Sequence, residues 1–332
     1  MGLSDAAFAI DAGNSKTDVA LVAADGTVLG EARGGGFQPH RDGTGRAVAG
    51  LAPLLATASE RAGLTGRVRV GHVQACLANA DLPVEEQRLT EALAARGWAE
   101  TVTVANDTFA LLRAGLPDEG EPTGVAVVCG AGINCAGLAP DGRIARFPAI
   151  GRLSGDWGGG GHLADEALWW AARADDGRGE PSELARALPD RFGLPDMPAL
   201  IEALHLGAVD AARRHELTPV LFAVAEAGDA VARAIVARQA EEVVAMAVVA
   251  LRRLDLLDAP VPVVLGGGVL AARHRLLHER VLALLADRAP KASPVVVTAP
   301  PVLGAALLTL DRGVAAAASL PGAYARLRAH YA

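Results

Sequence analysis

The stretch FAIDAGNSKTDVALVAADGTVLGEA (residues 8–32) decides the fold. It predicts an apolar strand, a glycine turn, a second strand, a tight hairpin at Asp25-Gly26 and a third strand, because Asp-Gly between two β-rich runs is a strong hairpin signal. A phosphate-binding turn needs backbone N–H groups presented without interference from a Cβ atom. A glycine turn directly after an apolar strand therefore suggests a nucleotide site.

The same plan returns in GVAVVCGAGINCAGLAPDGRIARF (residues 124–147). Its Asp-Gly pair, Asp141-Gly142, lies 116 residues after the first one, and the turn glycines Gly13 and Gly132 lie 119 residues apart. Two hairpin units at similar offsets indicate an internal duplication with equivalent roles. The alternative is a chance coincidence of the kind that any α/β protein can contain.

The rest of the chain alternates strands with helices, which predicts an α/β protein with two similar lobes. Helices are expected at 43–62, 83–97, 107–114, 229–254 and over much of the region after 160, and strands at 68–77, 101–105, 261–266 and from 295. The polar, turn-rich segment PDEGEPT marks a domain boundary. We place an N-terminal lobe at 1–117, joined by a C-terminal helix at about 311–332, and a C-terminal lobe at 118–310 with a helical insertion at about 160–255.

The composition excludes several classes of protein. A chain of 332 residues with 51% apolar and 21% charged residues is ordinary for a globular protein of about two domains. The net charge of −7 and the scattered basic residues argue against nucleic acid as a partner. Cys76, Cys129 and Cys135 lack the spacing of a disulfide framework or a metal site. With no signal peptide and no apolar run long enough for a bilayer, we expect a cytoplasmic protein without a membrane partner.

Three glycine clusters each follow an apolar strand: DAGNSK (11–16), GAGIN (130–134) and GGG (266–268). One cluster alone is weak support for nucleotide binding, because glycine also makes plain turns. Three together favour it. The sequence contains neither a P-loop motif nor the G-x-G-x-x-G fingerprint of a dinucleotide fold. The first turn leads into a hairpin, an arrangement in which two turns hold phosphates from opposite lobes.

These segments carry a family resemblance. DAGNSKTD (11–18) and GAGINCAG (130–137) resemble the two phosphate turns of the BadF/BadG/BcrA-type ATPase family, which includes N-acetylglucosamine kinases and belongs to the actin/hexokinase/Hsp70 superfamily. LGGGV (265–269) is similar to its adenosine segment, ANDTFALL (105–112) to the segment with its catalytic Asp, and SGDWGGGG (154–161) to its sugar-lobe motif. The motifs occur in the family's order and are specific only as a set.

The resemblance implies a two-lobed actin-like ATPase (ribonuclease H-like) fold, with a mixed five-stranded sheet and helices in each lobe. It implies an ATP- and Mg²⁺-dependent kinase of an amino sugar, with N-acetylglucosamine as the first candidate substrate and glucosamine as the second, and a homodimer. An ATPase that activates a partner redox enzyme through an iron–sulfur cluster is known in the same family and stays an alternative, as does a non-catalytic sugar sensor.

The family's site residues transfer to matching positions of this chain. Asp11 would order Mg²⁺ through water, and Asp107 would accept the proton of a sugar hydroxyl. The nucleotide-binding residues implied are Asp11, Gly13, Asn14, Ser15, Lys16, Thr17, Gly130, Ala131, Gly132, Asn134, Gly266, Gly267 and Gly268. The substrate-binding residues implied are Gln38, Asn106, Asp107, Gly155 and Asp156.

Two departures and several plainer interpretations accompany these assignments. Asn14 stands where the family usually has Gly, and Asn tolerates left-handed backbone better than other residues do. Gln38 stands where amino-sugar kinases have Asn, which leaves the sugar and its hydroxyl open. Asn106-Asp107 also suits a helix N-cap, and Asp156 suits a turn. Lys16 suits a solvated turn, as does Asn79.

Overall fold

The computed structural model describes residues 3–119, 122–312 and 322–332. The chain forms two compact units, and each is described by itself. The first comprises Met1–Ala126, Ala136–Ile144 and Val297–Ala332, and the second Val127–Cys135 and Ala145–Val296. The sequence interpretation instead divides the lobes at 117 and about 310. The segment from 297 falls in the first unit because its helix packs on the first sheet.

Each sheet has five strands. The first has the order β3-β2-β1-β4-β5, and the second has the order β10-β9-β6-β7-β8. In the first sheet β1 pairs antiparallel with β2 and parallel with β4, which pairs parallel with β5. The strands are β1 (Ala6–Ala12), β2 (Lys16–Ala23), β3 (Val28–Gly35), β4 (Val70–Leu77), β5 (Ala99–Asn106), β6 (Gly124–Cys129), β7 (Ile133–Leu138), β8 (Ile144–Arg146), β9 (Pro262–Gly266) and β10 (Ser293–Val296). The predicted fold class is confirmed.

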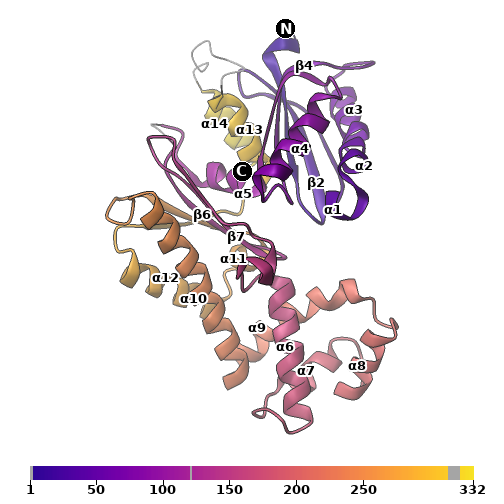
Figure 1. The fold of residues 1–332 in the computed structure, drawn as a ribbon, viewed down its shortest axis with the longest axis vertical. Coiled ribbons are helices and arrows are strands. Elements are labelled where there is room, and N and C mark those ends of the chain that lie inside the picture. Colours follow the sequence, from indigo (N-terminus) through magenta and orange to yellow (C-terminus); the bar gives the residue numbers. More distant parts are fainter. Residues whose placement is uncertain (1–2, 120–121, 313–321) are drawn as a thin grey trace. The chain divides into compact units, whose positions relative to one another are not determined.

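Helices complete both units (Figure 1). The first unit contains α1 (Pro39–Asp42), α2 (Thr44–Ala49), α3 (Ala52–Arg61), α4 (Pro83–Ala94), α5 (Asp107–Gly115), α13 (Pro301–Asp311) and α14 (Ala323–His330). The second contains α6 (Gly160–Asp175), α7 (Leu184–Asp190), α8 (Met197–His205), α9 (Leu217–Glu226), α10 (Ala230–Arg253), α11 (Gly268–Ala271) and α12 (Arg275–Arg288). Short 3₁₀ turns lie at Leu3–Asp5, Gly151–Ser154 and Ala211–Glu216.

The two Asp-Gly turns are built alike. The Asp25 carboxylate accepts a hydrogen bond from the backbone N–H of Thr27 at 3.0 Å, and the Asp141 carboxylate accepts one from Arg143 at 3.0 Å. The glycine after each aspartate is left-handed, with φ of 81° and 82°. The connections are longer than the predicted two-residue turn, because each strand ends before its aspartate. Similar turns and equivalent strand orders are what the proposed duplication predicts.

Strand β1 is buried on both faces, and its side chains alternate between two cores. Phe8 and Ile10 face a cluster made with α2, α3 and α4, whereas Ala9 faces α5 and α13. Figure 1 shows α2 and α3 on one side of this sheet and α13 on the other. The small side chain of Ala9 on this face of β1 lets α13 approach closely. Gly304 of α13 lies so near α5 that a Cβ atom there would be 1.7 Å from the carbonyl oxygen of Ala110.

The helix predicted over 43–62 is broken in two. Helix α2 ends at Ala49, and α3 begins at Ala52 with Pro53 in its first turn. Proline lacks a backbone N–H and fits the first turn of a helix, where that group has no intrahelical acceptor. Gly50 adds flexibility just before it. The break is therefore a local consequence of sequence that a hydrophobic pattern alone does not reveal.

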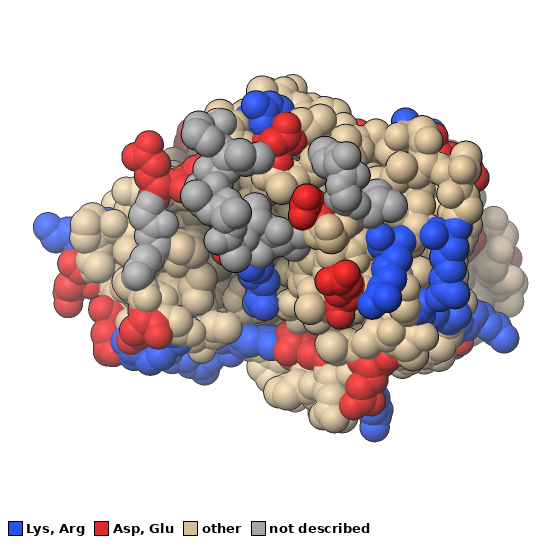
Figure 2. Space-filling view, turned by 90° about the horizontal axis from the view of Figure 1, so that it is seen from above, with Lys and Arg blue, Asp and Glu red and all other residues tan. Residues whose placement is uncertain are grey.

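Charges of both signs lie side by side on the face drawn in Figure 2, as the scattered basic residues predict. Among the helices of the described ranges, none is both long enough and apolar enough to cross a bilayer.

Candidate active site

The first unit gathers its predicted site residues where β1, β4 and β5 end. The three strands are parallel, with Asp11 opposite Cys76 and Leu77 opposite Asn106. Polar residues that follow such neighbouring strands meet at one edge of the sheet. Asp11 ends up 6% exposed there, and Asp107 begins α5 at the same edge. We call Asp11, Asp107 and the turn 13–17 the carboxylate edge.

Both carboxylates have raised pKa values. Burial, together with the negative charges of Asp107 and Asp18, raises the pKa of Asp11 to about 8, against a smaller lowering by Lys16. Burial also raises the pKa of Asp107 to about 6, although the backbone N–H groups of Thr108 and Asp107 oppose it. Two desolvated carboxylates near each other favour a proton or a bound cation. This donor set fits a Mg²⁺ ion that uses one carboxylate and takes its remaining ligands from phosphate and water.

The turn after β1 is held in shape by its neighbours. The backbone N–H of Gly13 donates to the carbonyl of Lys16 at 2.8 Å, and the N–H of Phe37 donates to the carbonyl of Gly13 at 2.9 Å. Gly36 lies so close that a Cβ atom there would be 2.0 Å from the Asn14 oxygen. The end of β3 therefore packs directly on the turn. Asn14 itself has none of the left-handed backbone that the departure from Gly raised as a concern.

Two amide side chains brace Asn14. Gln38 donates from Nε2 to the Asn14 carbonyl at 2.9 Å. Asn79 donates from Nδ2 to Asn14 Oδ1 at 2.9 Å and to the Phe37 carbonyl at 3.3 Å. Asn79 has a φ of 62°, a conformation that costs energy for a residue other than glycine. Gln38, predicted as a sugar ligand, thus donates its amide N–H to the turn 13–17.

Lys16 and Thr17 begin β2 at this edge. The Lys16 ammonium lies 3.3 Å from Asp18, which also accepts a hydrogen bond from Arg33 Nε at 2.5 Å. Thr17 is buried and pairs with Ala12, whereas Ser15 is exposed. Asp18, which was not among the predicted site residues, is buried; a charged residue within the otherwise apolar run of β2 is the signal that could have found it.

Asn106 orients the start of α5. Its Oδ1 accepts from the Thr108 N–H at 2.9 Å, and its Nδ2 donates to Asp81 at 2.8 Å. The residue is 3% exposed. The N-cap interpretation therefore holds for Asn106, and it leaves Asp107 in the first turn, where the positive end of the helix favours a carboxylate.

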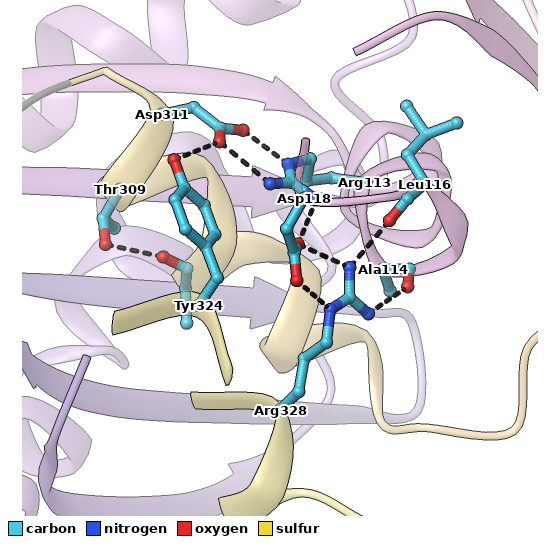
Figure 3. A network of polar contacts seen from close by, with 9 residues as sticks. Arg113, Ala114, Leu116, Asp118, Thr309, Asp311, Tyr324 and Arg328 are labelled. Atoms are coloured by element: carbon cyan, nitrogen blue, oxygen red, sulfur yellow. Dashed lines mark hydrogen bonds and ion pairs between the residues drawn. The ribbon is translucent and has the colours of Figure 1, made fainter. Parts of the chain in front are cut away.

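The other end of α5 is fixed by an ionic network around the buried Arg113 (Figure 3). Arg113 is 4% exposed and donates to both carboxylate oxygens of Asp311 at 2.6 and 3.0 Å. It also donates to Asp118 at 3.1 Å, and Asp118 accepts two further bonds from Arg328 of α14. Arg328 completes the network by binding the last carbonyls of the helix, those of Ala114 and Leu116. These ion pairs and hydrogen bonds thus hold the C-terminal end of the helix that carries Asp107.

The second unit gathers glycines rather than charges. The N–H of Gly130 donates to the Gly132 carbonyl at 2.9 Å, which closes the turn after β6. Gly160 and Gly161 donate to the carbonyls of Gly130 and Ala131 at 2.7 and 2.9 Å. We call residues 130–132, 158–161 and 266–268 the glycine cluster.

Close backbone approach explains why glycine is needed there. A Cβ atom on Gly159 would lie 2.4 Å from the carbonyl carbon of Gly132, and one on Gly267 would lie 2.5 Å from the Cys129 oxygen. Real Cβ atoms essentially never come so near, so both positions exclude a side chain. The cluster is a layer of bare backbone at the start of α6, whose N-terminus favours anions.

Several residues in or next to the glycine cluster were not predicted as site residues from the sequence. The motif at 154–161 drew attention to Asp156, whereas Gly159 and Gly160 make the contacts with the turn. Gln239 is 0% exposed and accepts from the Gly159 N–H at 3.0 Å. A lone amide among the apolar residues of α10 is the signal that could have found it. Asn134 uses its Oδ1 on the Cys135 N–H at 2.7 Å.

Asp156 lies in the same loop and is engaged locally. Its Oδ2 accepts from the Ser154 hydroxyl at 2.5 Å and from the Gly151 N–H at 3.0 Å. Gly155, just before it, is left-handed with φ of 83°. Asp156 therefore has the turn role that its sequence context suggests. Its Oδ1 makes no hydrogen bond with the described part of the chain.

The sequence matches the BadF/BadG/BcrA/BcrD ATPase family over residues 9–309. The chain belongs to this family. It is 26% identical to an N-acetyl-D-glucosamine kinase of Dictyostelium discoideum over 252 residues, which cover 74% of this chain and 76% of the relative. It is 26% identical to an N-acetylmuramic acid/N-acetylglucosamine kinase of Clostridium acetobutylicum over 202 residues, 61% of this chain and 65% of the relative.

Solved structures agree with this membership. A putative N-acetylglucosamine kinase from Chromobacterium violaceum superposes with a TM-score of 0.71 and 25% identity, covering 92% of this chain and 99% of the other. A ROK family glucokinase from Streptomyces griseus, solved with glucose and AMPPNP, superposes with a TM-score of 0.59 and 18% identity over 93% and 100% of the two chains. The latter likeness shows the fold alone.

Proposed function

We propose that this ATPase-family protein is an ATP-dependent kinase that phosphorylates a hydroxyl of an amino sugar, with N-acetylglucosamine as the first substrate to test. The observation that carries the proposal is the carboxylate edge, where Asp107 at a helix start lies near the buried Asp11 and the glycine turn. The kinase relatives named above add support.

In the proposed reaction Asp107 is the general base. It accepts the proton of the sugar hydroxyl while that oxygen forms a bond to the γ-phosphorus and ADP leaves. Its raised pKa of about 6 still leaves it mostly ionised near neutral pH, and it is a stronger base there than an ordinary aspartate. Phosphoryl transfer otherwise asks mainly for positioning and charge stabilisation.

The remaining residues have binding roles in this proposal. Asp11 would hold Mg²⁺, which offsets the negative charge of the phosphates. Turn 13–17 and the glycine cluster, with Asn134 beside it, would bind the nucleotide. Gln38, Asn106, Gly155 and Asp156 are proposed to line the sugar site; for Gln38 and Asn106 the hydrogen bonds described above favour an orienting role.

An activator of a partner enzyme is less compatible with the thiols. All three cysteines are buried. Burial raises the pKa of Cys129 to about 12 and raises those of Cys76 and Cys135 further. A thiolate that ligates iron needs the opposite environment. The described residues also contain no group of three or more candidate metal ligands.

The deciding experiment is a coupled ADP-release assay with Mg²⁺-ATP and a panel of N-acetylglucosamine, glucosamine, glucose and N-acetylmannosamine. We expect sugar-dependent ADP release, highest with N-acetylglucosamine. ATP binding measured in parallel is the control. Silence across the panel with ATP binding intact would contradict the proposal, and it would leave the sensor and the activator of a partner enzyme as the remaining interpretations.

A further inference from the structure

Helix α14 binds the far end of the helix that begins with Asp107 (Figure 3). Arg328 of α14 donates to the carbonyl of Ala114 at 2.9 Å and to the carbonyl of Leu116, the C-cap residue, at 2.7 Å. The last carbonyls of a helix have no partner within the helix and need one from elsewhere. Arg328 therefore caps α5 from a position 214 residues after Ala114.

Four charges balance one another at this end of α5. Arg328 donates to both carboxylate oxygens of Asp118, at 2.7 and 2.8 Å. Arg113 donates to Asp118 as well and to both oxygens of Asp311. This balance matters because Arg113 is buried, and a buried charge needs partners. Without Arg328, two carboxylates would share one arginine, and the end of the helix would lose its cap.

Helix α14 is also attached to the hairpin of β2 and β3. Arg326 donates to the carbonyl of Asp25 in the turn of that hairpin. A Cβ atom on Gly26 would lie 2.1 Å from the carbonyl oxygen of Ala323, so the start of α14 packs directly on the turn. The opposite end of β2 begins in the turn 13–17. One helix therefore holds both the hairpin of the phosphate turn and the helix of the proposed base.

The shape of α5 lets a change at one end reach the other. The helix has nine residues and is about 13 Å long. Its middle is in close contact with α13, where Gly304 meets the carbonyl of Ala110. A short helix that is released at its C-terminal end can tilt about this contact and move Asp107. A misplacement of about 1 Å can cost an enzyme roughly a hundredfold in rate.

We propose that Arg328 is a positioning residue for the reaction, because through α5 it keeps the Asp107 carboxylate in place beside the turn 13–17. The inference rests on the proposed function, in which Asp107 accepts the proton of the sugar hydroxyl. Arg328 contacts neither ATP nor sugar in this proposal. Its loss therefore slows the chemical step and leaves the binding of both substrates unchanged.

Steady-state ADP release with Mg²⁺-ATP and N-acetylglucosamine tests this in the wild type, Arg328→Ala, Arg328→Lys and Arg326→Ala. We expect Arg328→Ala to lower kcat about tenfold to a hundredfold and to leave KM for both substrates unchanged. Arg328→Lys keeps the charge without the planar fork, so it should recover part of the loss. Arg326→Ala is the matched control. Arg326 lies on the same helix, is exposed and binds the hairpin turn, so its loss should leave kcat unchanged.

Equal losses of kcat in Arg328→Ala and Arg326→Ala would overturn the inference, because they would indicate a general loosening of α14. An unchanged kcat in Arg328→Ala, or a rise in KM alone, would also overturn it and leave the proposed function standing. If Arg328→Ala does not fold, Arg328→Lys decides. A lower kcat at unchanged KM then supports the positioning role, and a wild-type kcat overturns it.

Hydrogen exchange separates this inference from the proposed function. If the wild type phosphorylates no sugar, the proposed function fails, and the exchange of the α5 amides decides whether Arg328 positions the helix. Faster exchange of these amides in Arg328→Ala than in Arg326→Ala supports that role. Equal exchange in the two variants overturns it.

Discussion

The carboxylate edge and the glycine cluster, for which we propose related binding roles, are built with different chemistry. The carboxylate edge is built from side chains, and burial raises the pKa values of Asp11 and Asp107. The glycine cluster is built from backbone, with donors and carbonyls of 130–132 and 158–161 in direct contact. Two hairpins of the same plan thus became specialised in opposite ways.

The contrast shows which kind of change each region tolerates. A side-chain site loses function when its chemical group is altered at constant shape, as in a change from Asp to Asn. A backbone site loses function when volume is added, even by a single methyl group. The following predictions test this contrast from the largest expected effect to the smallest.

Asp107→Asn should have the largest effect. The substitution keeps the shape and removes the base, so kcat should fall about 10²- to 10⁴-fold while KM for ATP changes little. ADP-release kinetics measure both. Glu60→Gln, an exposed carboxylate change on α3, is the matched control and should be silent.

The pH dependence of kcat/KM tests the same role of Asp107. A base must be ionised to act, so kcat/KM of the wild type should rise with pH through about 6, the pKa of Asp107 in the free protein. Wild-type turnover in Asp107→Asn, or a profile flat between pH 5 and 7, would remove Asp107 from the reaction.

Gly159→Ala should come next, because it adds a methyl group to the glycine cluster. The new Cβ would meet Gly132 at 2.4 Å, and we expect ATP affinity to fall about tenfold to a hundredfold, as misplaced contacts do. Calorimetric titration with ATP measures it.

Gly43→Ala is the control for backbone strain. Gly43 has a similar backbone conformation, with φ 82° and ψ 142° against φ 88° and ψ 159° for Gly159, but open space around its Cβ position. It should cost only about 1–3 kcal/mol of stability and spare ATP binding. Equal losses of ATP affinity in both variants would show that strain, rather than contact with the turn, governs the cluster.

Asp11→Asn should change the pH dependence of stability. The folded pKa of about 8 lies above the ordinary 3.8, so between these values the folded state holds a proton that the unfolded state lacks. The free energy of unfolding of the wild type therefore falls as pH rises, by about 1.4 kcal/mol per pH unit from this group. The variant lacks this loss and should exceed the wild type more at pH 8 than at pH 5.

Urea unfolding at both pH values, without nucleotide or Mg²⁺, provides the measurement. Glu60→Gln again serves as the control. A wild type and an Asp11→Asn variant with parallel pH dependence would contradict the raised pKa and, with it, the proposed cation site.

Gln38→Asn should have the smallest effect. Shortening the side chain removes the hydrogen bond to the Asn14 carbonyl, worth about 1 kcal/mol, so KM for ATP should rise about fivefold. The control is Gln87→Asn on the exposed face of α4. A rise in KM for the sugar instead would return Gln38 to the sugar site.

Much of the fold followed from local patterns. The apolar runs and turn residues along 8–32 predicted β1 to β3, and the β-branched run before Asn106 predicted β5. Asp11 was singled out because it precedes a glycine turn, and Asp107 because it is an acidic residue at a helix start. Each feature depends on residues only a few positions apart, and sequence reports such relations directly.

Long-range contacts were beyond those patterns. Nothing in the sequence pairs Gly159 with Gly132, or Gln38 with Asn14, because these contacts depend on how separate elements pack. The grouping of α13 with the first unit likewise depends on the match between Gly304 and the surface of α5.

The sequence by itself determined two repeated hairpins and an ordered set of glycine turns, since backbone preferences act locally, and the family resemblance of its motifs singled out the two carboxylates. Only the tertiary structure decided the properties of these groups. Burial raises the pKa values of Asp11 and Asp107, and the nearby charge of Asp107 adds to the shift of Asp11. The glycine cluster depends on backbone segments that meet from far apart in the chain. Desolvation and steric exclusion are properties of the packed molecule.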